Sequence, residues 1–201
     1  PGVHSLEAIT FEVCTNVHMN SMSSSGRWTC SSDHLPHSVQ MKLASGESIS
    51  VMTWNLLSES YIENIKEYDP HGQCLNEEKL AKVDVSARYY HQMITLRWFY
   101  EEAESRGDFW FIVLQEVDPE FLSRLDKLGL YYEKFLHNKL KHIYRCVVYN
   151  PDQITTLTTI DDSFNFLTHY YVSLTTGFQF ILGNYHLPFN IKQKPFKALS
   201  K

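Results

Sequence analysis

The sequence lacks the patterns that would tie the chain to a membrane or to a disulfide framework. No apolar run approaches the roughly 18 residues that a transmembrane helix requires, and no signal-peptide pattern opens the chain. Its four cysteines include no C-x-x-C pair and no short-spaced cluster with histidine. A structural zinc site of that kind is therefore not indicated, and free thiols are expected. We predict an intracellular, cytoplasmic protein without membrane insertion.

An excess of positive charge is also missing, because 18 basic residues stand against 23 acidic ones and give a net charge of −5. Any contact with nucleic acid would depend on a local basic strip or a bound metal and not on the overall field. An initiator Met is absent too, which predicts a processed product, an expressed piece or a fragment of something longer. What is present, 201 residues with 43% hydrophobic content, fits one domain with a substantial core over residues 1–201.

Two apolar runs predict strands that end at polar side chains. Ile49–Leu57 alternates β-branched and apolar residues and carries Asn55 to its end, as a buried strand would. Phe109–Leu114 is continuously apolar, which is typical of a strand covered on both faces, and it leads to Glu116. Taken alone, each segment is also compatible with a strand that ends in an ordinary turn.

Further patterns predict a mixed α/β chain. Strands are expected over residues 6–15, 39–43, 131–135, 144–149, 154–160, 170–174 and 178–182, with a hairpin at 44–48. A short helix is punctuated by Asp118-Pro119 and Gly129. A longer helix, or two abutting ones, is expected from Asn76 as N-cap to Arg106-Gly107. The apolar face expected for it comprises Leu80, Val83, Ala87, Tyr90, Ile94 and Trp98.

Three strand ends could meet at one rim of a layered sheet. They present Asn55, Glu116, and Asn184 with His186. A lone Glu or His after a strand is usually a loop or structural residue, but together these groups indicate a site. A carboxylate with oxygen-donor neighbours suits Mg²⁺ (or Mn²⁺), which takes one or two carboxylates plus water and substrate phosphate. A nearby His could activate water or stabilise developing charge.

Three stretches resemble the signature blocks of the endonuclease/exonuclease/phosphatase (deoxyribonuclease-like) family. In chain order they are Val51–Leu57 (VMTWNLL), Ile112–Val117 (IVLQEV) and Asn184–Leu187 (NYHL). The third departs from the usual N-T-H-L by Tyr185. The chain looks most like the deadenylase and nocturnin type, whose glutamate block is commonly followed, as here, by an Asp and a short helix. The resemblance implies an α/β fold, a two-layer β-sandwich flanked by helices.

The family's later S-D-H block does not follow His186 but is matched near the start, by Ser32–Pro36 (SDHLP). A strand follows it, as in the family. The resemblance therefore implies circular permutation, with residues 1–43 similar to the family's C-terminal part and 49–201 to its N-terminal part. The hairpin at 44–48 would join the two parts. The alternative is a chance S-D-H string.

The family's G-D-x-N block, which gives an Asp and an Asn to the metal site, is absent. Gly107–Trp110 (GDFW) begins like it but belongs to the strand that leads to Glu116. A second chain or segment could supply the missing pair. If nothing replaces it, activity should be reduced by orders of magnitude, since losing one preorganised charge interaction typically costs about 10²–10³ in rate.

Roles follow from the resemblance residue by residue. Glu116 would be the principal Mg²⁺ ligand, and Asn55 would support the metal or a phosphate oxygen. His34 would act as base or transition-state stabiliser, oriented by Asp33, and His186 would bind the scissile phosphate. Substrate-binding roles are implied for Asn184, Lys192 and Lys194.

The resemblance implies Mg²⁺-dependent phosphodiester hydrolysis, by a nuclease acting on RNA 3′ ends as a 3′ exonuclease or deadenylase does. RNA is expected as the partner in preference to DNA. A second hypothesis is a catalytically degenerate relative that serves as a binding or structural subunit. A third hypothesis keeps the fold but has phosphotyrosyl–nucleic-acid adducts or phospholipids as substrates. The quoted blocks contact the phosphate and the metal and do not distinguish leaving groups.

Overall fold

Two β-sheets and three helices make up most of the chain in the computed structural model. The structure describes residues 7–13, 20–22, 28–30, 32, 34–43, 46–62, 85–138, 142–163, 166–173 and 177–185. Several predictions fall outside these ranges, namely those for Asp33, Asn76, Leu80, Val83, His186, Lys192 and Lys194.

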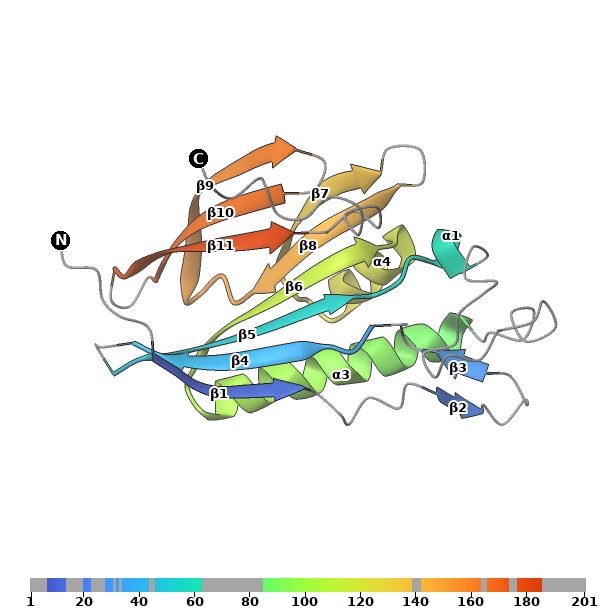
Figure 1. Cartoon of the computed structure of the whole chain (residues 1–201), viewed down its shortest axis with the longest axis horizontal. Coiled ribbons are helices and arrows are strands. Elements are labelled where there is room, and N and C mark those ends of the chain that lie inside the picture. The colour runs from blue at the N-terminus through green and yellow to red at the C-terminus, as the bar shows by residue number, and fades with distance from the viewer. Residues whose placement is uncertain are drawn as a thin grey trace, which may run out of the picture.

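The larger sheet has six strands (Figure 1). Its order is β1 (Glu7–Val13), β4 (His37–Lys42), β5 (Ser48–Asn55), β6 (Phe109–Val117), β8 (Ile143–Tyr149) and β7 (Tyr132–Asn138). Only the central pair β5 and β6 is parallel, and the other neighbours in this sheet are antiparallel. The sheet is thus mixed, and its two central strands end at the same edge. The predicted strands over 6–15, 39–43, 49–57, 109–114, 131–135 and 144–149 are confirmed.

A second sheet of three antiparallel strands packs on one face of the first. It comprises β9 (Ile154–Ser163), β10 (Phe166–Ser173) and β11 (Gln179–Tyr185), so the last three predicted strands are confirmed too. Between the sheets lies an apolar cluster in which Phe111 and Val147 of the large sheet meet Tyr171 and Phe180 of the small one. The two-layer arrangement predicted for the fold is therefore present.

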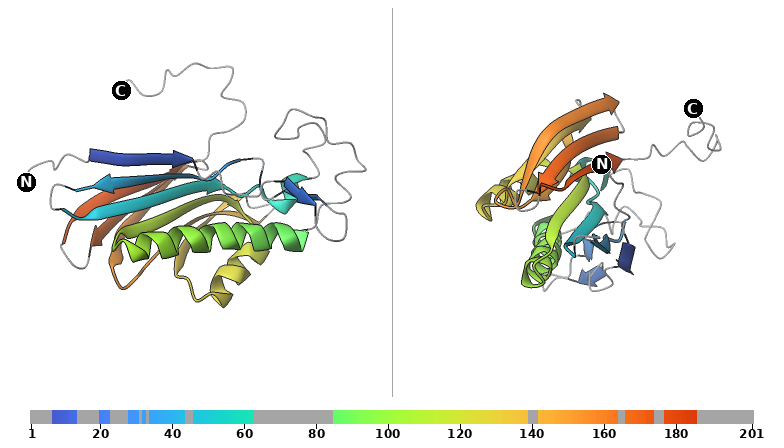
Figure 2. Two further views of the ribbon diagram at one scale, coloured as in Figure 1. Left: turned by 90° about the horizontal axis from the view of Figure 1, so that it is seen from below. Right: turned by 90° about the vertical axis from the view of Figure 1, so that its left-hand side faces the viewer.

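Helices cover the other face of the large sheet. These are α3 (Val85–Ser105) and α4 (Pro119–Lys127), which pack Leu96, Phe99 and Leu125 against Trp54 and other large side chains of β5 and β6. Figure 2 shows α3 and the small sheet on opposite sides of the large one. Since β6 is covered on both faces, all nine of its residues are buried, as its unbroken apolar run predicts.

Three short elements complete the described chain: α1 (Glu59–Ile62), β2 (Asn20–Met22) and β3 (Trp28–Cys30). The pair β2 and β3 was not predicted from the sequence. The hairpin at 44–48 is confirmed, because β4 and β5 pair in antiparallel register and Leu43 N–H donates to Glu47 O at 2.7 Å. No helix in the described part of the chain is long and apolar enough to cross a membrane.

The apolar face predicted for the long helix is wrong. Tyr90, Ile94 and Trp98 are 61%, 46% and 43% exposed. The face that α3 buries comprises Arg88, Tyr89, Gln92, Thr95, Leu96, Phe99 and Ala103. Three of these side chains are polar. Apolar periodicity therefore predicts that the face with Tyr90, Ile94 and Trp98 is buried, although that face is exposed. The predicted end of the helix at Arg106-Gly107 is confirmed, since Gly107 has a φ of 73° and closes the last turn onto Glu104 O.

Candidate functional site

The candidate site begins with an Asn and a Glu at the ends of two neighbouring parallel strands. β5 ends at Asn55, and in the register of the pair Asn55 faces Gln115, the residue before Glu116. In Figure 1 the arrowheads of β5, β6 and β11 point the same way, and β4 begins at that end. The strand ends that were predicted to converge therefore lie at one edge of the sandwich.

Asn55 and Glu116 contact each other directly. Asn55 Nδ2 donates to Glu116 Oε1 at 2.9 Å, and Asn55 Oδ1 accepts from Leu57 N–H at 2.9 Å. The second carboxylate oxygen, Oε2, accepts from Ser58 N–H at 3.3 Å. Glu116 is only 9% exposed, so this carboxylate is held by hydrogen bonds in a largely dry position.

The backbone around this pair adopts an uncommon conformation. Leu57 and Glu116 have φ values of 59° and 54°, in the left-handed region that residues with a Cβ rarely enter. A residue held there costs about 1–3 kcal/mol, and such residues cluster at functional sites. One of them carries the carboxylate and the other lies in the loop that donates to it, which indicates that the surrounding contacts fix its orientation.

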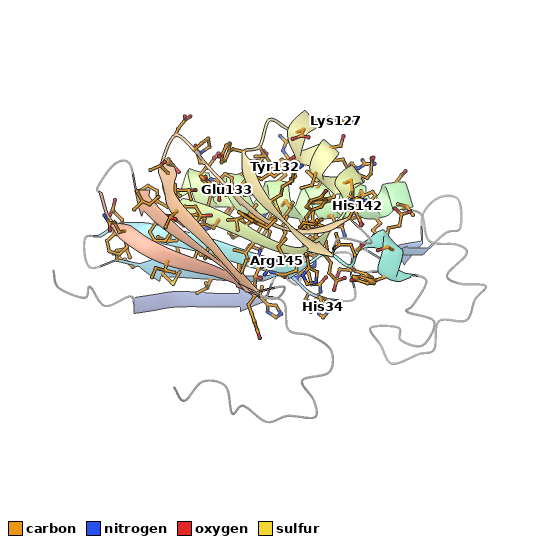
Figure 3. All side chains as sticks on the ribbon, turned by 90° about the horizontal axis from the view of Figure 1, so that it is seen from above. His34, Lys127, Tyr132, Glu133, His142 and Arg145 are labelled. Atoms are coloured by element: carbon orange, nitrogen blue, oxygen red, sulfur yellow. The ribbon has the colours of Figure 1, made fainter. Side chains whose placement is uncertain are left out.

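The segment before β4 brings His34 to the same edge. Ser32 Oγ donates to the backbone oxygen of Asn55 at 2.6 Å and accepts from His34 N–H at 3.0 Å. Trp54 Nε1 donates to His34 O at 2.8 Å. The backbone of His34 is thus anchored to β5 while its side chain stays exposed, at the outside of the molecule in Figure 3. The neighbouring Asp33 lies outside the described residues.

Asn184, near the end of β11, connects the small sheet to the large one beneath Glu116. Its Nδ2 donates to Leu114 O at 3.0 Å and to Cys146 O at 3.3 Å, and its Oδ1 accepts from Gln115 Nε2 at 3.0 Å. The side chain is fully buried, so these contacts are part of the interior. A substrate-binding role for Asn184 stays a prediction, as do the roles of His186, Lys192 and Lys194, which lie outside the described residues.

Below the pair, a second buried carboxylate fixes the loop after β5. Asp118 accepts from Ser58 Oγ at 2.6 Å, from Glu59 N–H at 2.8 Å and from Tyr89 Oη at 3.2 Å. Burial, and next the charge of Asp118, raise the pKa of the Tyr89 phenol, so Tyr89 stays protonated and donates. This network was missed at the sequence level. The only signal for it was the Asp that follows the glutamate block.

The donors at this edge fit Mg²⁺ in part. Glu116 offers a carboxylate beside the Asn55 amide, and Mg²⁺ in proteins often takes one or two carboxylates and fills its other positions with water and substrate phosphate. Within the described ranges no group of three or more His, Cys, Asp or Glu side chains is placed to hold a metal. Glu116 and Asn55 are the predicted metal ligands that the structure describes, and they contact each other at this edge.

No family model matches the chain, and no curated protein matches it. Among solved structures, the chain is similar to the crystal structure of ANGEL2, a 2′,3′-cyclic phosphatase, in complex with adenosine-2′,3′-vanadate. The identity is 18% and the TM-score 0.51, and the match covers 70% of this chain and 41% of that one. The chain thus spans less than half the length of ANGEL2. At this identity the similarity shows a shared fold.

Proposed function

We propose that this chain belongs to the endonuclease/exonuclease/phosphatase superfamily and takes part in Mg²⁺-dependent hydrolysis of phosphate esters in RNA. The observation that carries the proposal is the Asn55–Glu116 pair, with Asn55 Nδ2 2.9 Å from Glu116 Oε1 at the ends of two parallel strands. The backbone of His34 is tied to the same strand end by Trp54 and Ser32. These residues come from sequence blocks far apart in the chain, and the shared fold with ANGEL2 gives the proposal independent support.

The proposed roles follow the chemistry of each side chain. Glu116, kept in place by Asn55 and Ser58 N–H, would hold Mg²⁺, which when bound supplies charge neutralisation at the phosphate. His34, exposed at the same edge, would move a proton or stabilise charge at a phosphate oxygen, oriented by Asp33. His186 and Asn184 would complete the phosphate site, and Lys192 and Lys194 would contact the substrate backbone.

The order of the blocks belongs to the same proposal. The strand after the S-D-H string, β4, pairs with β5, the strand of the first block, through a short hairpin. A circularly permuted chain needs β4 and β5 to be neighbours, because the hairpin that joins them then lies at the opposite end of β5 from Asn55. A deadenylase-like substrate, an RNA 3′ end, remains the substrate class we favour. A second chain or segment would supply the Asp and Asn of the missing G-D-x-N block.

The test uses two RNA substrates, one with a 3′ adenosine tail and one that ends in a 2′,3′-cyclic phosphate. We expect hydrolysis of at least one of them with Mg²⁺ or Mn²⁺ and none in EDTA. Glu116→Gln should lower the rate by about 10²–10³, because the carboxylate charge is lost while the shape is kept. The matched control is Glu120→Gln, a Glu on α4 that is half exposed and forms an ion pair with Arg124 in its own helix.

Hydrolysis that persists in EDTA, or that survives Glu116→Gln, contradicts this function. Phosphotyrosyl–nucleic-acid and phospholipid substrates belong in the same assay, because the residues of the site contact phosphate and do not distinguish leaving groups.

The second candidate is a binding or structural subunit with the same fold. It is favoured by the absent G-D-x-N block and by the lack of a cluster of three metal ligands in the described part of the chain. RNA binding without turnover in Mg²⁺ or Mn²⁺, unchanged in Glu116→Gln, would support it.

A further inference from the structure

The buried face of α3 carries two polar side chains that reach the loop after β5. Arg88 and Gln92 are 1% and 0% exposed and stand one helical turn apart. Gln92 Nε2 donates to Leu56 O at 2.9 Å, and the guanidinium of Arg88 donates to Leu56 O and Leu57 O. Two carbonyl groups of the loop are therefore held toward the helix.

The opposite side of the same loop holds the candidate site. Leu57 N–H donates to Asn55 Oδ1, and Ser58 N–H donates to Glu116 Oε2. A peptide unit is planar, so fixing the Leu57 carbonyl also fixes the direction of the Ser58 N–H that follows it. The left-handed φ of Leu57 belongs to this turn of the backbone. The loop thus contacts α3 through its carbonyl groups and Glu116 through its Ser58 N–H, so the position of α3 affects the orientation of the Glu116 carboxylate.

Asp118 holds the loop from its far end. Its carboxylate accepts from Ser58 Oγ and Glu59 N–H, and it follows Glu116 by two residues in the chain. Ser58 is therefore fixed from two directions, by α3 through the Leu57 carbonyl and by Asp118 through its hydroxyl.

We propose that Arg88 and Gln92 are positioning residues for the metal site. They hold the Leu56–Ser58 loop in the one conformation in which its N–H groups orient Asn55 and Glu116. This inference rests on the proposed function, since it concerns the site in which Glu116 holds the metal. Groups that orient metal ligands in this way typically change metal affinity by about 10–100-fold when they are substituted.

Two conservative substitutions test the proposal. Arg88→Lys keeps the charge but replaces Nη2, which donates to both carbonyl oxygens, with an ammonium on a shorter side chain. Gln92→Met keeps the length but loses the donor. The matched control is Thr95→Val, on the same buried face, because Thr95 Oγ1 donates to His91 O within the helix and not to the loop after β5. Thermal unfolding measured by circular dichroism establishes that each variant is folded at the temperature used.

The measurement is calorimetric titration of the protein with Mn²⁺ alone, followed by the Mg²⁺ dependence of RNA hydrolysis. We expect Arg88→Lys and Gln92→Met to weaken Mn²⁺ binding at least tenfold, and Thr95→Val to leave it unchanged. In the hydrolysis assay the metal concentration for half-maximal rate should rise, and saturating Mg²⁺ should restore part of the rate. A residue that only stabilises the fold would not change the metal affinity of the folded protein.

The outcomes separate the two proposals. If the unsubstituted protein binds Mn²⁺, Glu116→Gln abolishes binding and both α3 variants bind normally, the function stands and the positioning role is wrong. If the unsubstituted protein binds no Mn²⁺, or Glu116→Gln binds it equally well, the proposed function is wrong and the positioning role falls with it. Should Arg88→Lys fail to fold, Gln92→Met alone decides between these results.

Discussion

Asp118 stands at the N-cap position of α4, yet its side chain makes no capping hydrogen bond to that helix. Its carboxylate instead accepts hydrogen bonds from Ser58, Glu59 and Tyr89, which lie 60, 59 and 29 positions away in the sequence. The helix start relies on Pro119, whose fixed φ suits the first turn. A residue that local sequence assigns to one helix thus serves the loop beneath the candidate site.

Ser58→Ala tests this contact. Removing the hydroxyl leaves a buried carboxylate oxygen of Asp118 without its donor, and an unsatisfied buried group costs about 1–3 kcal/mol. We expect the free energy of unfolding, measured by urea denaturation, to fall by that amount.

Ser105→Ala is the control, because Ser105 is exposed and its hydroxyl donates to Glu102 O in the same helix. Its effect should stay within about 0.5 kcal/mol. Equal losses in the two variants would contradict the importance of the Ser58–Asp118 contact.

At the scale of elements, α3 combines an exposed aromatic stripe with a buried face that is partly polar. Leu96 is fully buried on that face, whereas Ile94, two residues earlier, is 46% exposed. Leu96 and Ile94 thus allow the loss of a buried and of an exposed aliphatic side chain to be compared in one helix.

Leu96→Ala should lower the free energy of unfolding by about 2–5 kcal/mol, the usual cost of truncating a buried Leu. Ile94→Ala should change it by less than about 1 kcal/mol, since it creates no cavity and Ala is a better helix former. Chemical denaturation of both variants is the measurement. A larger loss for Ile94→Ala than for Leu96→Ala would mean that α3 buries the face predicted from apolar periodicity.

The helix also shows what could and could not be predicted from the sequence. The strands were predictable because alternation and apolar runs directly reflect burial, as in β5 and β6. The end of α3 was predictable because Gly107 follows it. Its orientation was not, since the buried Arg88 and Gln92 donate to carbonyl oxygens of a loop more than 30 residues away in sequence. Such a contact leaves no periodic trace.

At the scale of the whole molecule, buried phenols occur in both sheets and in α3. Burial is the first cause that raises the pKa of Tyr89, Tyr149 and Tyr171, and it raises the pKa of the partly exposed Tyr132 to about 12. In the unfolded chain these groups lose their protons near pH 10. The folded protein therefore binds more protons than the unfolded chain above that pH.

We expect the free energy of unfolding to begin to fall above about pH 8.5, because burial raises the pKa of the Cys146 thiol. Above about pH 10 the fall should steepen, by up to about 1.4 kcal/mol per pH unit for each fully buried tyrosine. Urea denaturation at a series of pH values measures this, with phenolate absorbance as the readout of ionisation. Tyr171→Phe should reduce the slope, and Tyr90→Phe, at an exposed position, should not. A profile that stays flat to pH 11 would contradict the role of these buried phenols.

Convergence of the candidate site was predictable only in outline. The three strand ends could be predicted to meet because each follows an apolar run in the sequence, but the contacts that join them could not. Gln115 and Asn184 are 69 positions apart, and the Ser32 hydroxyl reaches Asn55 from the segment before β4. Pairings of this kind follow from the stacking of the sheets, which no local pattern encodes.

The amide of Asn184 faces two carbonyl oxygens on one side and the Gln115 side-chain N–H on the other. The position therefore demands a short side chain that both donates and accepts. An Asp would set a carboxylate against two carbonyl oxygens, and a Leu would remove all three hydrogen bonds. The Asn at this point is thus required by complementarity between the two sheets, whatever the molecule binds at its edge.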